Sequence, residues 1–440
     1  MKITLWKYKR VVRHHIRAGQ LMAVWGMIIC SLLAGITMNK QLMLLVLVGC
    51  FVVILIRAKF SFFSAFSFIL LFSYLQEHIA AIDSSRAGGM LFAGMGIPIY
   101  IHELYICTVF FYIVEYIFFS LTDVLLNEKK MYTNSLELNR KVAHIFAFGA
   151  LFLIILSYPS MPTLSGTLSR NEGMIQSSRF VQIAMFLLAL TYDSLKKYKD
   201  ILVAWIISLI WVLFHGDRVI VFGFLIYCAL KYLNSRPAVK RHVEKRHVDQ
   251  IKNVIIKYKK ILLVVAAAVC VAILGIRLQL SRSGYSTQNL NLSTIVNSIL
   301  IQGTACDVVY VFNCATDLWK HGNQLNGYTL LQYIVCWIPF LPNPYYPASV
   351  IMNYYTTLGG GLFFAEPMMN FGLVGTLLFS SAFLFFLCAV LNNPSRFKCF
   401  FWIPFVITIF RMTWYLGLDS WVTMSIYIAP ILYYIAKKVK

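Results

Sequence analysis

The sequence has few charged residues and even fewer acidic ones. Only 13% of its 440 residues are charged, and 17 aspartates and glutamates stand against 39 lysines and arginines. A soluble globular domain carries about 25% charged residues, so this composition excludes an ordinary soluble protein. Hydrophobic residues make up 60% of the chain, and the mean hydropathy is +0.73. We therefore expect a membrane protein built from apolar helices.

The sequence also lacks the short motifs of soluble enzymes and of metal sites. It contains no Walker loop, no GxSxG elbow, no HExxH motif and no EF-hand. Its ten cysteines form no CxxC pair, so we expect no metal cluster and no metal cofactor. Because no RNA- or DNA-binding motif accompanies the excess of basic residues, we expect no nucleic-acid partner.

What the sequence does contain is a series of apolar stretches of the length that crosses a bilayer, about 20 residues. We predict an all-α, polytopic protein with one transmembrane domain over residues 1–440 and a large outer loop at 279–365. The twelve predicted spans are 20–38, 41–57, 60–76, 97–121, 142–158, 175–193, 200–215, 217–233, 261–278, 366–391, 399–416 and 421–436.

The basic residues predict the orientation of these spans. With a cytoplasmic N-terminus, 30 of the 39 lysines and arginines fall in cytoplasmic segments, as the positive-inside rule requires. Both termini are then cytoplasmic, the loop faces outward, and the basic segments attract anionic membrane lipids. Within the loop, apolar residues over 291–319 recur at helical spacing. This pattern predicts one or two amphipathic helices at the membrane surface.

Seven of the nine remaining basic residues are arginines, and several lie at or within the ends of spans. A charge at membrane depth is expensive and usually faces a cavity or a partner. Guanidinium suits the forked recognition of phosphate. The candidate ligands of a diphosphate are Arg218, Arg277, Arg282 and Arg411. Each of them could instead pair with a carboxylate or reach lipid headgroups.

Three residues are candidate proton acceptors. Glu366 follows a glycine-rich turn and begins a predicted span, where it serves either as a base facing an outer cavity or as a helix N-terminal acid. Asp217 lies at an outer hairpin tip between two spans. His321 is the only histidine in the outer loop. The sequence leaves the choice among these three open.

Short motifs accompany this topology. They are Gly-Asp-Arg at 216–218, the string from Gly359 to Gly375, and Arg411 in the following span. In the string, glycines precede the acid Glu366, and Asn370-Phe371-Gly372-Leu373-Val374-Gly375 follows. With its twelve spans and late outer loop, the chain resembles bacterial O-antigen polymerases, the Wzy-type oligosaccharide repeat-unit polymerases.

The resemblance implies a glycosyltransferase of the bacterial inner membrane with a GT-C-like fold. Such an enzyme joins repeat units carried on undecaprenyl diphosphate at the periplasmic face during lipopolysaccharide O-antigen synthesis. It needs neither nucleotide sugar nor metal, and a chain-length regulator protein is a partner to consider. Arg218, Glu366 and Arg411 carry over as matched positions, whereas Arg277 and Arg282 are candidates by location alone.

Two rival functions fit a similar topology. A flippase moves the same lipid-linked units, but transporters usually show repeated halves, and here a single asymmetric loop dominates. A ligase attaches finished polymer to the lipid A core, and in that family a loop histidine is important. His321 is the histidine that would take this role.

Overall fold

The computed structural model describes residues 2–82, 97–134, 136–160, 178–215, 218–234, 303–337, 350–357, 360–415 and 421–438. Every regular element in these ranges is a helix, which confirms the all-α prediction. The chain divides into two compact units that are interleaved in sequence. Unit 1 comprises residues 1–128, 302–393 and 413–416, and unit 2 comprises 129–301, 394–412 and 417–440.

Six helices of the described part are long and apolar enough to cross a membrane, and each coincides with a predicted span. They are α1 (Lys2–Thr37, apolar over Ala18–Thr37), α2 (Lys40–Ala58), α3 (Phe62–Ile82), α4 (Ile101–Leu121), α6 (Arg140–Ser157) and α15 (Ala365–Leu391). Three further predicted spans correspond to the shorter helices α7 (Ser178–Leu190), α8 (Lys199–Phe214) and α9 (Arg218–Asn234). The predicted span 261–278 lies outside the described residues, so the number twelve stays a prediction.

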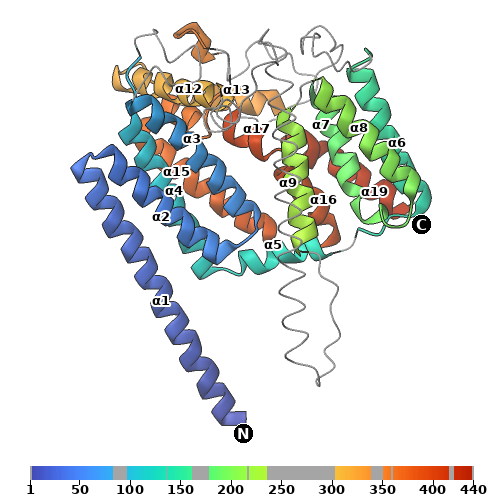
Figure 1. Ribbon diagram of the computed structural model, residues 1–440, viewed down its shortest axis with the longest axis horizontal. Coiled ribbons are helices and arrows are strands. Elements are labelled where there is room, and N and C mark those ends of the chain that lie inside the picture. The colour runs from blue at the N-terminus through green and yellow to red at the C-terminus, as the bar shows by residue number, and fades with distance from the viewer. Residues whose placement is uncertain are drawn as a thin grey trace, which may run out of the picture. The chain divides into compact units, whose positions relative to one another are not determined.

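In unit 1, helices α2, α3 and α4 pack on one another, α15 packs on α4, and α12 (Gly303–Lys320) lies across the ends of α3 and α15 (Figure 1). An aromatic cluster fills the centre. The Phe363 ring lies 5.4 Å from that of Phe66 and 4.9 Å from that of Phe383, and Phe66 stacks on Phe111 at 5.4 Å. Such pairs contribute about 0.5–1.5 kcal/mol each beyond the burial of area. Phe363 therefore anchors the turn before Glu366 in the core.

For its described part, the prediction of amphipathic helices over 291–319 is confirmed as to the helix, whereas the position at the membrane surface stays a prediction. There the chain forms the single helix α12, whose side chains from Ala305 to Leu318 are all buried except the half-buried Asp307. The polar side of α12 carries Asn313 and Asp317, and both find hydrogen-bond partners on other segments of unit 1. Helical spacing reveals an apolar stripe, but it cannot show whether the opposite stripe meets water or polar protein groups.

The last two predicted spans are each divided, and each contains a proline. The span 399–416 is split into α16 (Arg396–Ile407) and α17 (Ile409–Trp414). Thr408 is the C-cap of α16, with φ −90° and ψ 12°. Its N–H and its hydroxyl both donate to the carbonyl oxygen of Pro404, at 2.9 and 2.6 Å. The last span consists of the π-helix η5 (Thr423–Ile428) and α19 (Ala429–Lys438). Pro430 crowds the preceding turn and lacks an N–H, and a wider π-turn accommodates both effects.

Candidate active site

Glu366 is a buried carboxyl group at the beginning of an apolar helix. It is the second residue of α15, and only 4% of its surface is exposed. The Thr329 hydroxyl hydrogen-bonds to the carboxyl group, but Oε1 has no hydrogen-bond partner among the described residues. A buried polar atom without a partner is costly, and ionisable groups within membrane helices are functional candidates by default.

Helix α15 breaks one and a half turns after Glu366, at Gly372, where φ is 64° and ψ is −156°. The break leaves the carbonyl groups of Met369 and Asn370 without their usual helical donors. The N–H groups of Leu325 and Asn326 bond them instead, at 2.9 and 3.1 Å. The loop between α12 and α13 (Tyr328–Trp337) thus takes the place of the next helical turn.

The Asn370 side chain connects this docked loop to Glu366. Its Oδ1 accepts the N–H of Gly327 at 3.0 Å, and its Nδ2 donates to Thr329 Oγ1 at 2.5 Å and to the Glu366 carbonyl at 2.9 Å. Because Thr329 Oγ1 accepts from Asn370, the Thr329 hydroxyl proton is available for the Glu366 carboxyl. Asn370 therefore orients the Thr329 hydroxyl that contacts that carboxyl.

Two glycines of the string are required by the backbone. A Cβ on Gly372 would overlap the Trp319 indole, and its positive φ is unfavourable for any other residue. Gly360 has φ +84°, and a Cβ there would lie 3.2 Å from the Trp414 carbonyl oxygen. That close approach lets the segment 413–415 run beside residues 361–363, with Gly361 N–H bonding Trp414 O at 3.1 Å.

A second polar cluster in unit 1 surrounds Asp317 of α12. Its carboxylate accepts the hydroxyls of Tyr100 and Tyr355, each at 2.7 Å. Burial and this hydrogen bond raise the pKa of Tyr355, so its hydroxyl stays a donor. His321 Nδ1 lies 2.9 Å from the Asp317 carbonyl oxygen and 3.5 Å from its Oδ2. With the proton on Nδ1, the exposed Nε2 of His321 is left as an acceptor.

The structure adds acidic residues to which no sequence motif assigns a role. Glu77 of α3 is fully buried; its Oε2 accepts from Asn313 at 3.2 Å, and its Oε1 has no partner within the described ranges. Asp307 is half-buried, and burial raises its pKa to about 6. In a chain with only 17 acidic residues, the scarcity of acids was the one signal that could have marked them.

The predicted arginines belong to the other unit. Arg411 lies in α17 and is partly buried, and Arg218 is the first residue of α9. Asp217, Arg277 and Arg282 lie outside the described residues. In unit 1, no hydrogen bond or ion pair among the described residues joins Glu366 to His321.

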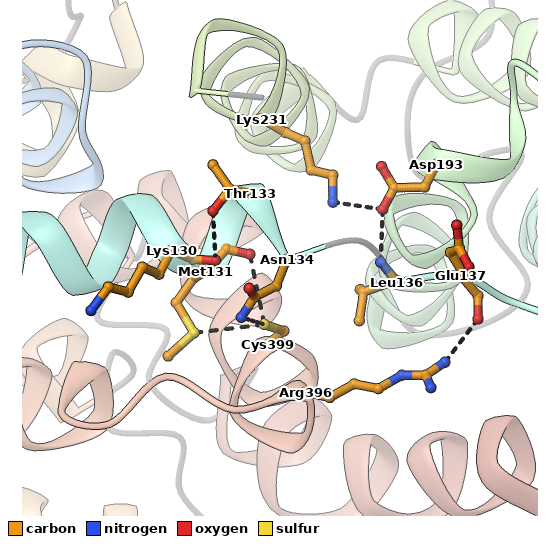
Figure 2. Close-up of polar contacts among 10 residues, drawn as sticks. All are labelled: Lys130, Met131, Thr133, Asn134, Leu136, Glu137, Asp193, Lys231, Arg396 and Cys399. Atoms are coloured by element: carbon orange, nitrogen blue, oxygen red, sulfur yellow. Dashed lines mark hydrogen bonds and ion pairs between the residues drawn. The ribbon is translucent and has the colours of Figure 1, made fainter. Parts of the chain in front are cut away.

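Unit 2 holds a different kind of carboxylate, the partly buried Asp193, shown in Figure 2. Lys231 Nζ lies 2.8 Å from Asp193 Oδ2, which also accepts the N–H of Leu136 at 2.9 Å. Nearby, Arg396 donates to the Glu137 carbonyl at 2.8 Å. Asp193 is therefore compensated by a cation and by a backbone donor. These contacts join the segment after α5 (Val124–Thr133), η2 (Tyr192–Ser194), α9 and α16.

No protein-family model, no curated protein and no solved structure matches the chain. The site is therefore interpreted from its own chemistry. Unit 1 offers a buried carboxyl group with a free acceptor oxygen and an exposed histidine next to a carboxylate. Both arrangements suit proton transfer from a hydroxyl group.

Proposed function

We propose that the chain is a repeat-unit polymerase of the O-antigen type. In this proposal it joins oligosaccharides carried on undecaprenyl diphosphate at the outer face of the bacterial inner membrane. The observation that carries the proposal is Glu366, a buried carboxyl group with a free oxygen at the end of an apolar helix. A base at that position suits a substrate whose lipid tail lies in the bilayer and whose sugars lie outside it.

The proposed reaction needs one base and one cationic site. A hydroxyl of the acceptor sugar attacks the anomeric carbon that carries the diphosphate, and its proton passes to Glu366. The glycosidic bond forms as the bond from that carbon to the diphosphate oxygen breaks. Undecaprenyl diphosphate leaves with the electron pair. Arg218 and Arg411 would neutralise its charge, with Arg277 and Arg282 as further candidates.

The resemblance described from the sequence supports the same assignment. Three residues of the string shape the structure on either side of Glu366: Gly360 admits the neighbouring segment, Asn370 orients Thr329, and Gly372 breaks the helix. Supporting residues around one carboxyl group are expected when that group is the reactive one.

A second candidate is the ligase that transfers finished polymer to the lipid A core. The observation that favours it is the His321–Asp317 contact, which leaves an exposed ring nitrogen as an acceptor. In this reaction His321 would take the proton of the core sugar, and Asp317 would hold the ring. The two candidates differ in the acceptor and in the base.

Deletion of the gene in its host, followed by gel electrophoresis of the surface polysaccharide, tests both. Core bearing a single repeat unit is expected for a lost polymerase. Core alone would favour the ligase, or a flippase of the lipid-linked unit. An unchanged ladder would exclude all three functions.

Complementation of the deletion strain then tests the residues. Glu366→Gln, Arg218→Ala and Arg411→Ala should fail to restore the ladder when their amounts in the membrane match the wild type. Glu137→Gln is the matched control, because this glutamate side chain is 75% exposed. Full ladders from Glu366→Gln with loss from His321→Ala would transfer the role of base to the histidine.

A further inference from the structure

Helix α13 presents large apolar side chains on an exposed face. Tyr328, Leu331 and Val335 are 51%, 65% and 39% exposed. Their spacing of three and four residues puts them on one face of the helix. The ten residues of α13 include no charged side chain. Soluble surfaces rarely expose contiguous apolar patches of this kind, which mark contact with a partner or a membrane.

This face is continuous with the exposed stripe of a candidate membrane span. In α15, Phe371, Val374 and Leu378 are 47%, 69% and 67% exposed. The two stripes meet where the Phe371 ring contacts Gly327, the residue before α13; a Cβ on that glycine would lie 3.0 Å from the ring. The exposed stripe of α15 faces hydrocarbon if α15 crosses the membrane.

We propose that α13 is an interfacial helix whose face of Tyr328, Leu331 and Val335 contacts the lipids of the bilayer. At ten residues it is about 15 Å long, which is too short to span the hydrocarbon core. A short helix with one apolar face instead lies in the plane of the interface, with that face a few ångströms deep. The continuity with α15 identifies lipid as the occupant of this face.

The opposite side of α13 carries Thr329, which is fully buried and bonds the Glu366 carboxyl. The three consecutive residues before α13 are fastened to α15 by hydrogen bonds of 2.9, 3.1 and 3.0 Å. The depth of α13 in the interface therefore sets the depth of Glu366, at the level of lipid headgroups. In a polymerase, the diphosphate of a lipid-linked substrate lies at this headgroup level. This match between Glu366 and the diphosphate rests on the proposed function, whereas the contact of α13 with lipid does not.

Photo-crosslinking identifies the occupant directly. Leu331 is replaced by p-benzoylphenylalanine in the full-length protein, which is reconstituted into vesicles of phosphatidylethanolamine and phosphatidylglycerol and irradiated. Mass spectrometry then distinguishes a phospholipid adduct, a dimer and a crosslink within the chain. p-Benzoylphenylalanine in place of Val374 of α15 is the lipid-facing control. p-Benzoylphenylalanine in place of Gln324, in the exposed α12–α13 loop, is the water-facing control.

We expect a phospholipid adduct at Leu331 with a yield like that at Val374. We expect no phospholipid adduct at Gln324. Crosslinked dimers would assign the face to a second copy of the chain. An internal crosslink would assign it to another segment of the same chain, and a reaction with neither lipid nor protein would assign it to water. Each of these three results overturns the proposal. None of them bears on the polysaccharide ladder, so the failure of this inference and of the proposed function are distinguishable.

Discussion

Two carboxyl groups, the partly buried Asp193 in unit 2 and the buried Glu366 in unit 1, have opposite environments. Asp193 in unit 2 meets Lys231 and a backbone N–H on the same oxygen. Glu366 in unit 1 bonds one hydroxyl, and its Oε1 has no partner in the described part of the chain. The Asp193 arrangement is compensated within the fold and needs no ligand. The Glu366 arrangement leaves acceptor capacity in an apolar setting, where it is costly unless a substrate uses it.

The contrast suggests how to separate structural from functional acids in this protein. A compensated acid should matter for stability, and an uncompensated one for activity. The experiments below break or sharpen this distinction, in order of decreasing effect.

The largest effect is expected from Glu366→Gln. Loss of a general base typically lowers a rate by about 10²–10⁴-fold, so the polysaccharide ladder should collapse to single units. The amide keeps the volume of the carboxyl group, so the unfolding temperature of the purified protein should not fall. A full ladder together with a lowered unfolding temperature would reverse the roles assigned to the two acids.

Lys231→Met should act in the opposite way. It leaves Asp193 without its cation, and breaking a buried ion pair costs about 3–5 kcal/mol. Since the Asp193 side chain is 22% exposed, we expect about 3 kcal/mol, the lower end of that range. Thermal unfolding in detergent measures it. The control is Lys197→Met, whose pair with Glu137 is exposed and worth about 0–1 kcal/mol; equal effects from both variants would contradict the prediction.

Gly372→Ala should have a smaller effect on stability. The positive φ costs of order 1–3 kcal/mol for other residues, and the new Cβ would overlap the Trp319 indole. Gly149→Ala in α6 is the control, because nothing lies within 4 Å of its Cβ position and alanine favours a helix by about 1 kcal/mol. A Gly372→Ala protein as stable as Gly149→Ala would show that the break in α15 is not required.

The smallest effect concerns pH and Asp307. Its folded pKa, about 6, lies above the ordinary value of 3.8 because of burial. The folded state therefore binds the proton more tightly than the unfolded chain, and stability falls as pH rises from 3.8 through 6. Unfolding temperatures of wild type and Asp307→Asn should be similar at acidic pH, and the variant should be the more stable at neutral pH. Parallel curves would place Asp307 in water.

The membrane-helix content could be predicted from the sequence because it depends on local composition. Each of the six long apolar helices coincides with a predicted span. The prolines explain where prediction from hydropathy was less accurate. Residues 399–416 are apolar except for Thr408, Arg411 and Thr413, yet the helix ends at Ile407, three residues after Pro404. The burial of α12 was missed because its polar face meets protein groups that are distant in sequence.

The candidate site could be predicted only in part. The sequence marked Glu366 and the string around it. The break at Gly372 and the docking of the α12–α13 loop could not be predicted from the sequence, because Leu325 and Met369 are brought together only by folding. Asp317 was likewise missed as the partner of Tyr100, which is 217 residues away in sequence.

What the sequence by itself determined is therefore the class of the protein, the long apolar helices and the acids and arginines worth testing. These follow from composition and short-range pattern. Only the tertiary structure decided which acid is compensated: Asp193 meets a lysine 38 residues away, while Glu366 meets no cation among the described residues of its unit. The physical reason is that the free energy of a buried charge depends on the partners that folding brings to it.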